Sequence, residues 1–428
     1  MLNQKVVFIA GCRTPFAKSG TDFANLTAYD LGRMATNGLL KKVGIDGSAI
    51  DLTIIGTVVH QIQTSNLARE IALGAAIQPK SPAFTVSLAC ISANMALSLA
   101  ADQLILGKAK LVVAGGADSV SDIPIQVAKS LRSKLLKAKN AKSTADYIKL
   151  IAGLRPNDLK PQIPTITEFS TGLSMGQDCQ KLADKLGISR NDQDAFALRS
   201  HELAYHAAQS GWLDNEITAV QTPPNFTNIT NDNGVRAQLH PEKLAALPSA
   251  FAKPYGSITA GNASFLTDGA ASTLLTTQHQ AQTFGLKPLA VLRGYVLTAQ
   301  NPATGELLLG PAYAIPQVLQ QTGLQITDID VIELHEAFAA QVLANIRCLA
   351  NDTFCRDNLN LASAFGELPM DKINTWGGSL AIGHPFGATG ARLVSTAINR
   401  LHREDKQFAL VASCAAGGHG HAMIWERI

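Results

Sequence analysis

The stretch TVSLACISANMALSLA, residues 85–100, contains a strand–turn–helix unit from which the fold can be predicted. An apolar run at residues 84–88 predicts a strand, and the apolar spacing at residues 92–106 predicts a helix. Cys90 stands between the two, so its sulfur is expected near a helix N-terminus, where the helix dipole favours a thiolate. Position alone also allows a buried structural cysteine.

A second cysteine has a matching setting in LVASCAAGGHGHAMI, residues 410–424. Cys414 ends a predicted strand at residues 408–413, and the small residues after it leave its sulfur and nearby backbone N–H groups accessible. The alternative is again a buried core cysteine. Each half of the chain therefore contains a strand that ends near a cysteine, and a duplicated fold would bring the two strand ends together.

Composition and pattern indicate a large α/β protein. The chain has 428 residues, of which 46% are hydrophobic and 16% charged, so we expect two or three domains, an extensive core and an oligomer interface. Helical periodicity, for example at residues 192–210, alternates with strand-like runs, which favours mostly parallel sheets covered by helices. The other predicted strands are residues 6–10, 52–58, 111–114, 290–295 and 331–334.

The sequence disfavours several classes of protein. The six cysteines form no C-x-x-C pair, so metal ribbons and disulfide scaffolds are not expected, and a reducing cytoplasm fits. No apolar run reaches the roughly 20 residues of a membrane span. No signal-peptide pattern precedes the first strand-like run. The net charge of +3 does not indicate nucleic-acid binding.

A histidine suited to general base catalysis occurs in WGGSLAIGHPFGATGAR, residues 376–392. The glycines around His384 let the backbone turn tightly and approach a ligand, although a hydrogen-bonded loop histidine is the alternative. A cysteine nucleophile needs a base to form its thiolate and an acid to protonate what leaves. Because Cys90, His384 and Cys414 can fill these roles, they indicate thioester carbon–carbon chemistry rather than peptide hydrolysis.

Three other histidines and a glycine-rich run have open interpretations. His335, in IELHEAFAAQ, follows a predicted strand and opens a helix, with a capping or core histidine as the alternative. His419 and His421 resemble metal ligands, but no third ligand has suitable spacing, so we expect structural roles. The run YGSITAGNASFLTDGA, residues 255–270, is loop-like and suits the polar arm of a cofactor, but has neither the P-loop nor the Rossmann pattern.

The segment at residues 128–164 interrupts the α/β alternation. It has nine lysines and arginines against two aspartates, and apolar residues are interleaved among them. Such a segment can lie on an anionic membrane surface or bind nucleotide phosphates. A solvated insertion is the alternative.

Taken in order, these motifs resemble the thiolase family nearly from end to end. The resemblance implies the α/β thiolase fold: two αβα halves packed into a five-layer αβαβα core, with an inserted loop domain, assembled at least as a homodimer. We divide the chain accordingly into residues 1–120, an insertion at 121–250, a return at 251–275, and a second half at 276–428. The motifs that carry the resemblance, besides the two cysteine stretches, are CRTPFAK (12–18), AGGADSVS (114–121), STGLSMG (170–176), RSH (199–201), TAGNASFLTDGAA (259–271), HEAFAAQ (335–341) and GGSLAIGHPFGATGAR (377–392).

One motif narrows the resemblance to a branch of the family. Many thiolases have asparagine where this chain has His335, and histidine there resembles the β-subunits of the bacterial anaerobic fatty-acid oxidation complex and the trifunctional complex. The resemblance implies an α2β2 complex with a hydratase/dehydrogenase subunit. It also implies a cytoplasmic location, with peripheral contact to the inner membrane through the segment at residues 128–164 as an option.

The resemblance also implies the reaction, thiolysis of 3-ketoacyl-CoA to acetyl-CoA and a shortened acyl-CoA, with the reverse condensation as the other direction. Coenzyme A is then a substrate, and no metal or redox cofactor is required. The implied roles are nucleophile for Cys90, general base for His384, acid and base for Cys414, a first oxyanion hole from His335 and His384, a second from the backbone N–H groups of Cys90 and Ala416, and pantetheine contact for Ser264.

One departure and two rival functions bear on this interpretation. Many relatives have glycine at the position of Ala416, but a contact made by the backbone N–H survives that change. A decarboxylating ketosynthase shares the cysteine nucleophile and the fold, yet ordinarily uses two histidines and lacks the second cysteine, so Cys414 argues against it. A non-catalytic membrane-binding scaffold would suit the basic segment but would not need the catalytic set.

Overall fold

A mixed β-sheet runs through the computed structural model, which describes residues 4–162 and 167–428. Its strands follow the order β12-β13-β14-β11-β1-β10-β5-β3-β4, with β2 beside β10. The bounds are β1 (Val6–Arg13), β2 (Ala17–Lys18), β3 (Leu52–Gly56), β4 (Ala83–Val86), β5 (Leu111–Asp118), β10 (Thr267–Thr277), β11 (Ala290–Ala299), β12 (Val331–Leu334), β13 (Phe408–Ala415) and β14 (His419–Arg427).

The sheet consists of two halves with the same topology. In the first half β3 is parallel to β4 and β5, and β10 is antiparallel to β5 and β1. In the second half β12 is parallel to β13, and β14 is antiparallel to β13 and β11. A parallel bridge between Ile332 and Ile373 takes the place of β4. The halves meet in a two-residue pairing of β1 with β11. The predicted duplication is confirmed, but the two cysteine strands are not its equivalent pair, because β13 before Cys414 corresponds to β5, whereas β4 before Cys90 corresponds to the bridge at Ile373.

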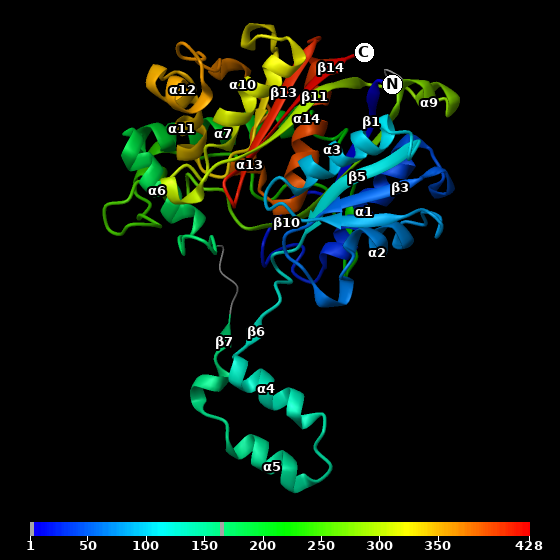
Figure 1. The fold of residues 1–428 in the computed structure, drawn as a ribbon, viewed down its shortest axis with the longest axis vertical. Helices are drawn as coiled ribbons and strands as arrows, with labels where there is room; N and C mark the ends of the chain where they lie inside the picture. The colour runs from blue at the N-terminus through cyan, green and yellow to red at the C-terminus, as the bar shows by residue number, and fades with distance from the viewer. Residues whose placement is uncertain (1–3, 163–166) are drawn as a thin grey trace.

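Helices form three layers around the two halves of the sheet (Figure 1). Between the halves lie α3 (Ser92–Ile105), which packs on β3 and β5, and α14 (Thr389–Arg403), which packs on β12 and β13. On the outer faces, α1 (Ala28–Val43) and α2 (Leu67–Gly74) cover the first half. Helix α10 (Gly310–Thr322) covers the second half and packs against α11 (Ala339–Leu349). The layers are therefore α, β, α, β and α, as predicted.

The two central helices approach each other closely near their N-termini. Both are lined with small and aliphatic residues whose side chains are fully buried, such as Ala96 and Leu393. A Cβ atom added to Gly390 would lie 2.0 Å from Oδ1 of Asn94, so only glycine allows this approach. Because Asn94 follows Cys90 by one helical turn and Gly390 follows His384 closely, the contact places the two predicted catalytic residues near each other.

Between β5 and β10 the chain makes a long excursion, residues 119–266. Two of its helices pack on the second half: α6 (Met175–Leu186) on α11, and α7 (Arg190–Gln209) on α11 and α13 (Ser379–Ile382). The remaining elements of the excursion are β6 (Gln126–Val127), α4 (Lys129–Ala138), α5 (Thr144–Ala152), β7 (Pro161–Gln162), β8 (Val220–Thr222), β9 (Thr227–Ile229) and α8 (Pro241–Ala245); α9 (Gln278–Thr283) and α12 (Asp352–Leu359) follow later in the chain.

The basic segment forms a helical hairpin that stands away from the rest of the molecule (Figure 1). Helices α4 and α5 pack on each other at the end of a stalk made by β6 and β7, and neither helix buries a residue. The last two residues of the predicted segment, 163 and 164, lie outside the described residues. Within the described chain, no helix has both the length and the apolar character needed to cross a membrane.

His421 is a buried histidine of β14 that lies in the packing between the sheet and α3. Its Nε2 atom is 2.9 Å from the hydroxyl of Ser98, and its ring stacks on Tyr295 with the centroids 5.9 Å apart. The structural role predicted for it is consistent with this position. Burial lowers the pKa of His421 from 6.5 to about 3.

We expect His421 to make folding stability depend on pH. The unfolded chain takes up a proton on this histidine below about pH 6.5, whereas the folded chain does not until about pH 3. Stability is therefore present above pH 6.5 and is lost as pH falls, by about 2 kcal/mol between pH 7 and pH 5 for one such group. His421→Gln should reduce the slope of unfolding free energy against pH by the contribution of this one group, measured by urea denaturation. His279→Gln, at an exposed position, should keep the parent slope, and equal slopes for all three proteins would contradict the expectation.

Candidate active site

Cys90 lies in a tight turn that leads into α3. Strand β4 ends at Val86, earlier than predicted, and Ala89 adopts a left-handed backbone with φ of 46°. The hydroxyl of Ser92 accepts a hydrogen bond from the Leu88 N–H at 2.8 Å and donates one to the Ala89 carbonyl at 2.7 Å, which closes the turn. Cys90 is thereby held at the start of the helix, as predicted, with its side chain partly accessible.

The surroundings of the Cys90 thiol set its protonation. Burial raises its pKa to about 12, the backbone N–H groups of Ala416 and of Cys90 itself oppose that rise, and the negative charge of Asp118 adds to it. The resting group is therefore a neutral thiol, and its thiolate needs a base. The two opposing N–H groups point at the sulfur, where a negative charge would develop.

The backbone before His384 requires glycine. Gly383 has φ of 112°, and a Cβ atom there would lie 2.8 Å from Cγ2 of Thr267. The N–H of His384 donates to the hydroxyl of the same threonine at 2.9 Å. Thr267 begins β10, so the first half of the sheet fixes the position of a histidine that belongs to the second half.

Hydrogen bonds on one side of the His384 ring assign its tautomer. Its Nδ1 atom lies 2.6 Å from the hydroxyl of Thr389, and that hydroxyl donates its own proton to the Pro385 carbonyl at 3.3 Å. Nδ1 must then supply the proton of the shared hydrogen bond. This leaves a lone pair on Nε2, an atom that is buried and has no partner in the described chain. Burial, followed by the charge of Arg392, lowers the pKa of His384 to about 3, so the ring is neutral.

His335 lies in the loop after β12 rather than at the start of a helix. The next helix, α11, begins only at Ala339, so the prediction that His335 opens a helix is wrong. The backbone instead continues the sheet pairing, since the His335 N–H donates to the Ala412 carbonyl at 2.9 Å. The side chain points inward, with Nδ1 3.2 Å from the Ser379 hydroxyl. Burial, then His384 and Arg392, lowers the pKa of His335 well below its usual range.

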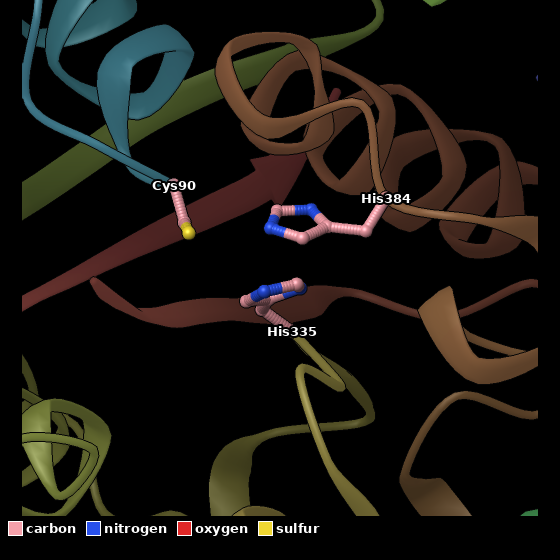
Figure 2. A group of neighbouring side chains, drawn as sticks. All are labelled: Cys90, His335 and His384. Carbon is pink, nitrogen blue, oxygen red and sulfur yellow. The ribbon is translucent and has the colours of Figure 1, made fainter. Parts of the chain in front are cut away.

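Cys90, His335 and His384 form a compact cluster (Figure 2). Each of them offers a sulfur or nitrogen atom, and these atoms lie within 4.8 Å of one another. The two imidazole rings are tilted by 43° with their centroids 4.1 Å apart. One thiol and two imidazoles are also a ligand set that zinc accepts. In the neutral cluster the His384 imidazole is a base beside the Cys90 thiol, and the His335 imidazole lies beside both groups.

Cys414 reaches the same region from the end of β13. It is buried, and burial together with the neighbouring Cys90 raises its pKa far above the usual range. The turn after it uses left-handed backbone at Gly417 and Gly418, and the Gly417 N–H donates to the Glu168 carboxylate at 2.7 Å. The excursion therefore holds the loop that carries Ala416.

Two cavities meet at Cys90. A narrow one of about 90 Å³ is lined by Cys90, His384, Cys414 and Ser264, so it brings the predicted catalytic residues and the predicted pantetheine contact together. A larger one of about 430 Å³ has mainly apolar walls. Its lining includes Val58, Val59, Ile123, Pro124 and Gln126. Both cavities contact Cys90, Met175, Phe386 and Ala416.

Asp118 is a structural anchor of the site that sequence reasoning missed. Its buried carboxylate accepts hydrogen bonds from the Thr57 hydroxyl at 2.9 Å, from the N–H groups of Val58 at 3.0 Å and Val59 at 2.7 Å, and from the Gly387 N–H at 2.6 Å. It therefore joins the loop after β3 to the turn after His384. Two signals were available: its position at the carboxyl end of a strand and its place within the AGGADSVS motif.

Comparison with known proteins agrees with this architecture. Residues 6–279 match the family model of the thiolase N-terminal domain, and residues 286–427 match that of the thiolase C-terminal domain. The chain is 45% identical over 423 residues to the mitochondrial trifunctional enzyme subunit beta of Bos taurus, covering 99% of this chain and 88% of that protein. It is 43% identical over 422 residues to the 3-ketoacyl-CoA thiolase of Yersinia pestis (strain Pestoides F), covering 99% and 97%.

A solved structure extends the comparison to the fold. The crystal structure of human mitochondrial 3-ketoacyl-CoA thiolase has a TM-score of 0.84 at 27% identity, covering 100% of both chains. Two αβα halves around a cysteine–histidine centre define an acyltransferase with an α/β fold. The chain belongs to the thiolase family.

We expect Asp118→Asn to lower both activity and stability. The amide keeps one acceptor oxygen, but its NH2 group would face a backbone N–H, so at least one hydrogen bond becomes a repulsive contact, at a cost of about 1–3 kcal/mol. The turnover number kcat per folded molecule should also fall, because the Gly387 turn after His384 loses its anchor. Asp51→Asn is a matched control, since Asp51 accepts from the N–H groups of Lys110 and Leu111 away from the site. Parent-like kcat in Asp118→Asn would show that the anchor is dispensable.

Proposed function

We propose that the chain is a 3-ketoacyl-CoA thiolase of fatty-acid β-oxidation, which uses CoA to cleave 3-ketoacyl-CoA into acetyl-CoA and an acyl-CoA two carbons shorter. The observation that carries the proposal is the placement of Cys90, His384 and Cys414 around one narrow cavity. The same groups serve the reverse Claisen condensation. Identities of 43–45% to proteins named for this activity support it.

The first step forms the nucleophile. Nε2 of His384 takes the proton of the Cys90 thiol, and the resulting thiolate attacks the 3-keto carbon of the substrate. The neutral state of both groups suits this transfer, because His384 has a free lone pair and Cys90 keeps its proton until the substrate arrives.

The second step breaks the bond between carbons 2 and 3. Its electron pair passes to the acetyl-CoA fragment as an enolate, while the acyl group stays on Cys90 as a thioester. Cys414 then donates its thiol proton to carbon 2, which releases acetyl-CoA. The enolate oxygen needs donors that are in place beforehand, a role that we assign to the Nε2 atoms of His335 and His384, the latter now protonated.

The third step transfers the acyl group to CoA. The Cys414 thiolate takes the thiol proton of the incoming CoA, and the CoA sulfur attacks the thioester carbon. The carbonyl oxygen becomes an oxyanion, and we assign its stabilisation to the backbone N–H groups of Cys90 and Ala416. The same two N–H groups oppose the rise in the pKa of the Cys90 thiol, so they favour negative charge on the adjacent sulfur. The Cys90 sulfur then leaves with the bonding electrons and recovers its proton from His384. No step requires a metal or a redox cofactor, because the thioester itself stabilises the enolate.

The two cavities suggest where the two ends of the substrate lie. We assign the pantetheine arm to the narrow cavity with Ser264, and the acyl chain to the larger apolar cavity beside Val58 and Val59. The position of Cys414 in the narrow cavity favours this function over a decarboxylating ketosynthase, because that mechanism has no use for a second thiol.

We expect brief incubation with 3-ketoacyl-CoA in the absence of free CoA to acylate Cys90. Cys90 is the sulfur beside the base lone pair and the two N–H donors, so peptide mass analysis should place the acyl group there. Cys414→Ser should lose turnover while Cys90 remains open to alkylation. An acyl group on Cys414 with Cys90 unmodified, or near-normal thiolysis by Cys414→Ser, would refute these roles. Thiolysis rates over a series of chain lengths would measure how far the apolar cavity extends.

The assembly of the protein is a second part of the proposal. Similarity to proteins named as the beta subunit of a trifunctional enzyme supports a complex with other subunits. We propose a homodimeric core that pairs with a hydratase/dehydrogenase subunit in an α2β2 complex. We further propose a cytoplasmic enzyme that contacts the inner membrane through the α4–α5 hairpin.

The hairpin has the surface that peripheral membrane contact needs. Its apolar side chains are exposed, with Leu136 at 68%, Ile148 at 61% and Ile151 at 65%. Lysines such as Lys137 and Lys139 are interleaved with them. Lys134, by contrast, ion-pairs with Asp158 at 3.5 Å and belongs to the packing of the hairpin itself. Basic and apolar groups that share one protruding element favour an anionic lipid surface.

We expect the hairpin to bind anionic liposomes. Each basic residue near such a surface contributes about 1 kcal/mol, and salt screens the attraction. Co-sedimentation should therefore be strong with anionic lipid, weak with neutral lipid and reduced by salt. Replacing Lys137, Lys139 and Lys142 by Glu should weaken it without abolishing thiolysis. The control replaces three exposed lysines outside the hairpin by Glu, for the same change in net charge: Lys41, Lys108 and Lys287.

Two outcomes would redirect this interpretation. If the parent protein ignores anionic liposomes at low salt, the hairpin is better interpreted as a protein-docking element or a solvated insertion. If both triple variants bind equally weakly, net charge rather than the hairpin drives binding.

A further inference from the structure

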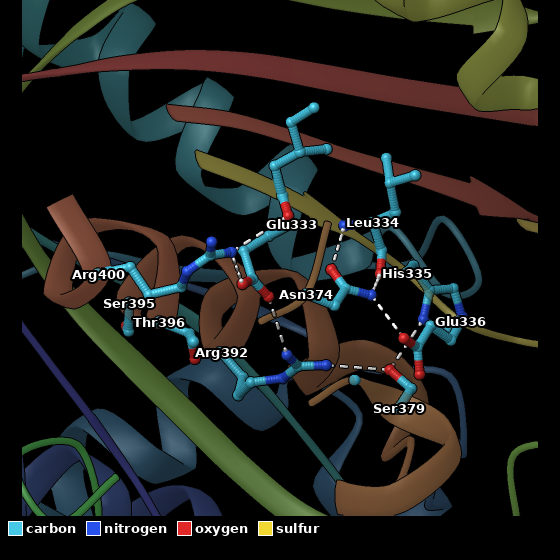
Figure 3. A network of polar contacts seen from close by, with 12 residues as sticks. Glu333, Leu334, His335, Glu336, Asn374, Ser379, Arg392, Ser395, Thr396 and Arg400 are labelled. Atoms are coloured by element: carbon cyan, nitrogen blue, oxygen red, sulfur yellow. Dashed lines mark hydrogen bonds and ion pairs between the residues drawn. The ribbon is translucent and has the colours of Figure 1, made fainter. Parts of the chain in front are cut away.

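A serine connects His335 to a buried arginine. The hydroxyl of Ser379 lies 3.2 Å from Nδ1 of His335 and accepts a hydrogen bond from Nη2 of Arg392 at 3.0 Å (Figure 3). All three side chains are fully buried. On its other side, Arg392 lies 3.5 Å from the carboxylate of Glu333. That carboxylate in turn accepts a hydrogen bond from Arg400 at 2.8 Å, which fixes the acidic group beside Arg392.

The protons of this chain can be placed from the donors available. Arg392 carries only donors, so the Ser379 oxygen accepts in that contact. The serine then has one proton to donate, and in the described part of the structure its only other partner is Nδ1 of His335. Nδ1 therefore accepts, and the ring proton of neutral His335 resides on Nε2. That atom is buried, unpartnered and directed into the cluster with Cys90.

We propose that Ser379, oriented by Arg392, is a positioning residue that fixes the His335 tautomer with its proton on Nε2. The inference rests on the proposed function in one respect only, namely that this Nε2–H donates to the enolate oxygen. The adjacent His384 has the opposite arrangement, since Thr389 accepts from its Nδ1 and leaves a lone pair on Nε2. Two neighbouring imidazoles thus face the substrate with different functions, one as a base and one as a donor.

The fixed tautomer of His335 also affects metal binding. A zinc ion bound by Cys90, His335 and His384 would need a lone pair on both Nε2 atoms. Ser379 keeps a proton on Nε2 of His335, so this nitrogen has no lone pair for a metal. The cluster should therefore bind metal poorly in spite of its ligand set. Ser379→Asp reverses the arrangement, because a carboxylate only accepts and requires the proton on Nδ1. A carboxylate behind a ligating histidine is the usual partner in zinc sites.

The direct test is the tautomer of the resting enzyme, which needs no substrate. A long-range proton–nitrogen correlation spectrum of the dimer labelled with nitrogen-15 at histidine distinguishes the two neutral forms, and the His335→Gln spectrum assigns the signal. We expect the Nε2–H form in the parent and in Ser379→Thr. Observation of the Nδ1–H form in the parent would overturn the proposal, whatever the variants do.

The variants test how the fixed His335 tautomer affects activity and metal binding. Ser379→Ala should lower kcat about 10-fold or more, approaching the 100- to 1,000-fold that loss of an oxyanion donor costs, with a smaller change in KM. Alkylation of Cys90 should persist because His384 is intact. Ser379→Asp should also lower kcat but should bind Zn²⁺ more tightly than the parent by about 10- to 100-fold in calorimetry. If Ser379→Asp only disordered the site, both kcat and zinc binding would be lost.

The controls distinguish the effect of the His335 tautomer from the effect of losing a buried hydroxyl group. Ser395→Ala removes a buried hydroxyl that donates only to the Ala391 carbonyl within α14, and it should retain parent kcat and zinc affinity. Full kcat in Ser379→Ala, or unchanged zinc affinity in a folded Ser379→Asp, would overturn the proposal. If the parent protein shows the Nε2–H form but has no thiolysis activity, the proposed function is contradicted and the proposed tautomer is not.

Discussion

The close approach of α3 and α14 is the constraint on which the active site depends. Gly390 lets the Asn94 side chain fit against α14 where a Cβ atom would clash at 2.0 Å. The loops that lead into these helices carry Cys90 and His384, so the helix contact sets the distance between the proposed nucleophile and the proposed base. Asp118 and Thr267 from the first half of the sheet then fix the loop of the second half through hydrogen bonds to Gly387 and His384. The catalytic centre is thus assembled from both halves, and neither half contains it alone.

Burial gives the centre its electrostatic character. It raises the pKa of Cys90 and Cys414 and lowers that of His335 and His384, so four titratable groups share a small volume without charge. Charge develops only when a proton moves from sulfur to nitrogen, and hydrogen-bond donors are already aimed at that region. In such a centre, the position of each ring proton decides the chemistry more than a net charge does. Neighbours such as Thr389 and Ser379 therefore matter although neither needs to contact the substrate.

The sequence predicted the parts of the site that local pattern determines. Cys90 and Cys414 were found because small residues and predicted strands flank them, and His384 because glycines surround it. Asp118, Ser379 and Glu168 were missed, because their hydrogen bonds to Gly387, His335 and Gly417 span 269, 44 and 249 residues and no periodicity encodes such contacts. The helices of the basic segment were also not predicted, since their apolar faces are not buried. The fold class, by contrast, followed from the family motifs. The mostly parallel sheets expected from the alternation of helices and strands were wrong, because β10 and β14 pair antiparallel with both of their neighbours in the two halves. The four-part division of the chain stays a prediction.

Duplication explains why the two halves contribute different chemistry to one point. In each half an edge strand or bridge is followed by a loop, and a central helix then packs between the two halves before the chain enters the next strand of the same half. In the first half the loop before the central helix carries Cys90, and in the second half the corresponding loop carries His384. The loops before the two central helices therefore present the proposed nucleophile and the proposed base to each other from related positions. His335 and Cys414 come from the ends of neighbouring parallel strands, β12 and β13, and complete the centre on the second half alone. Equivalent backbones have thus acquired separate functions through their loop residues, while the sheet that aligns them has kept one topology.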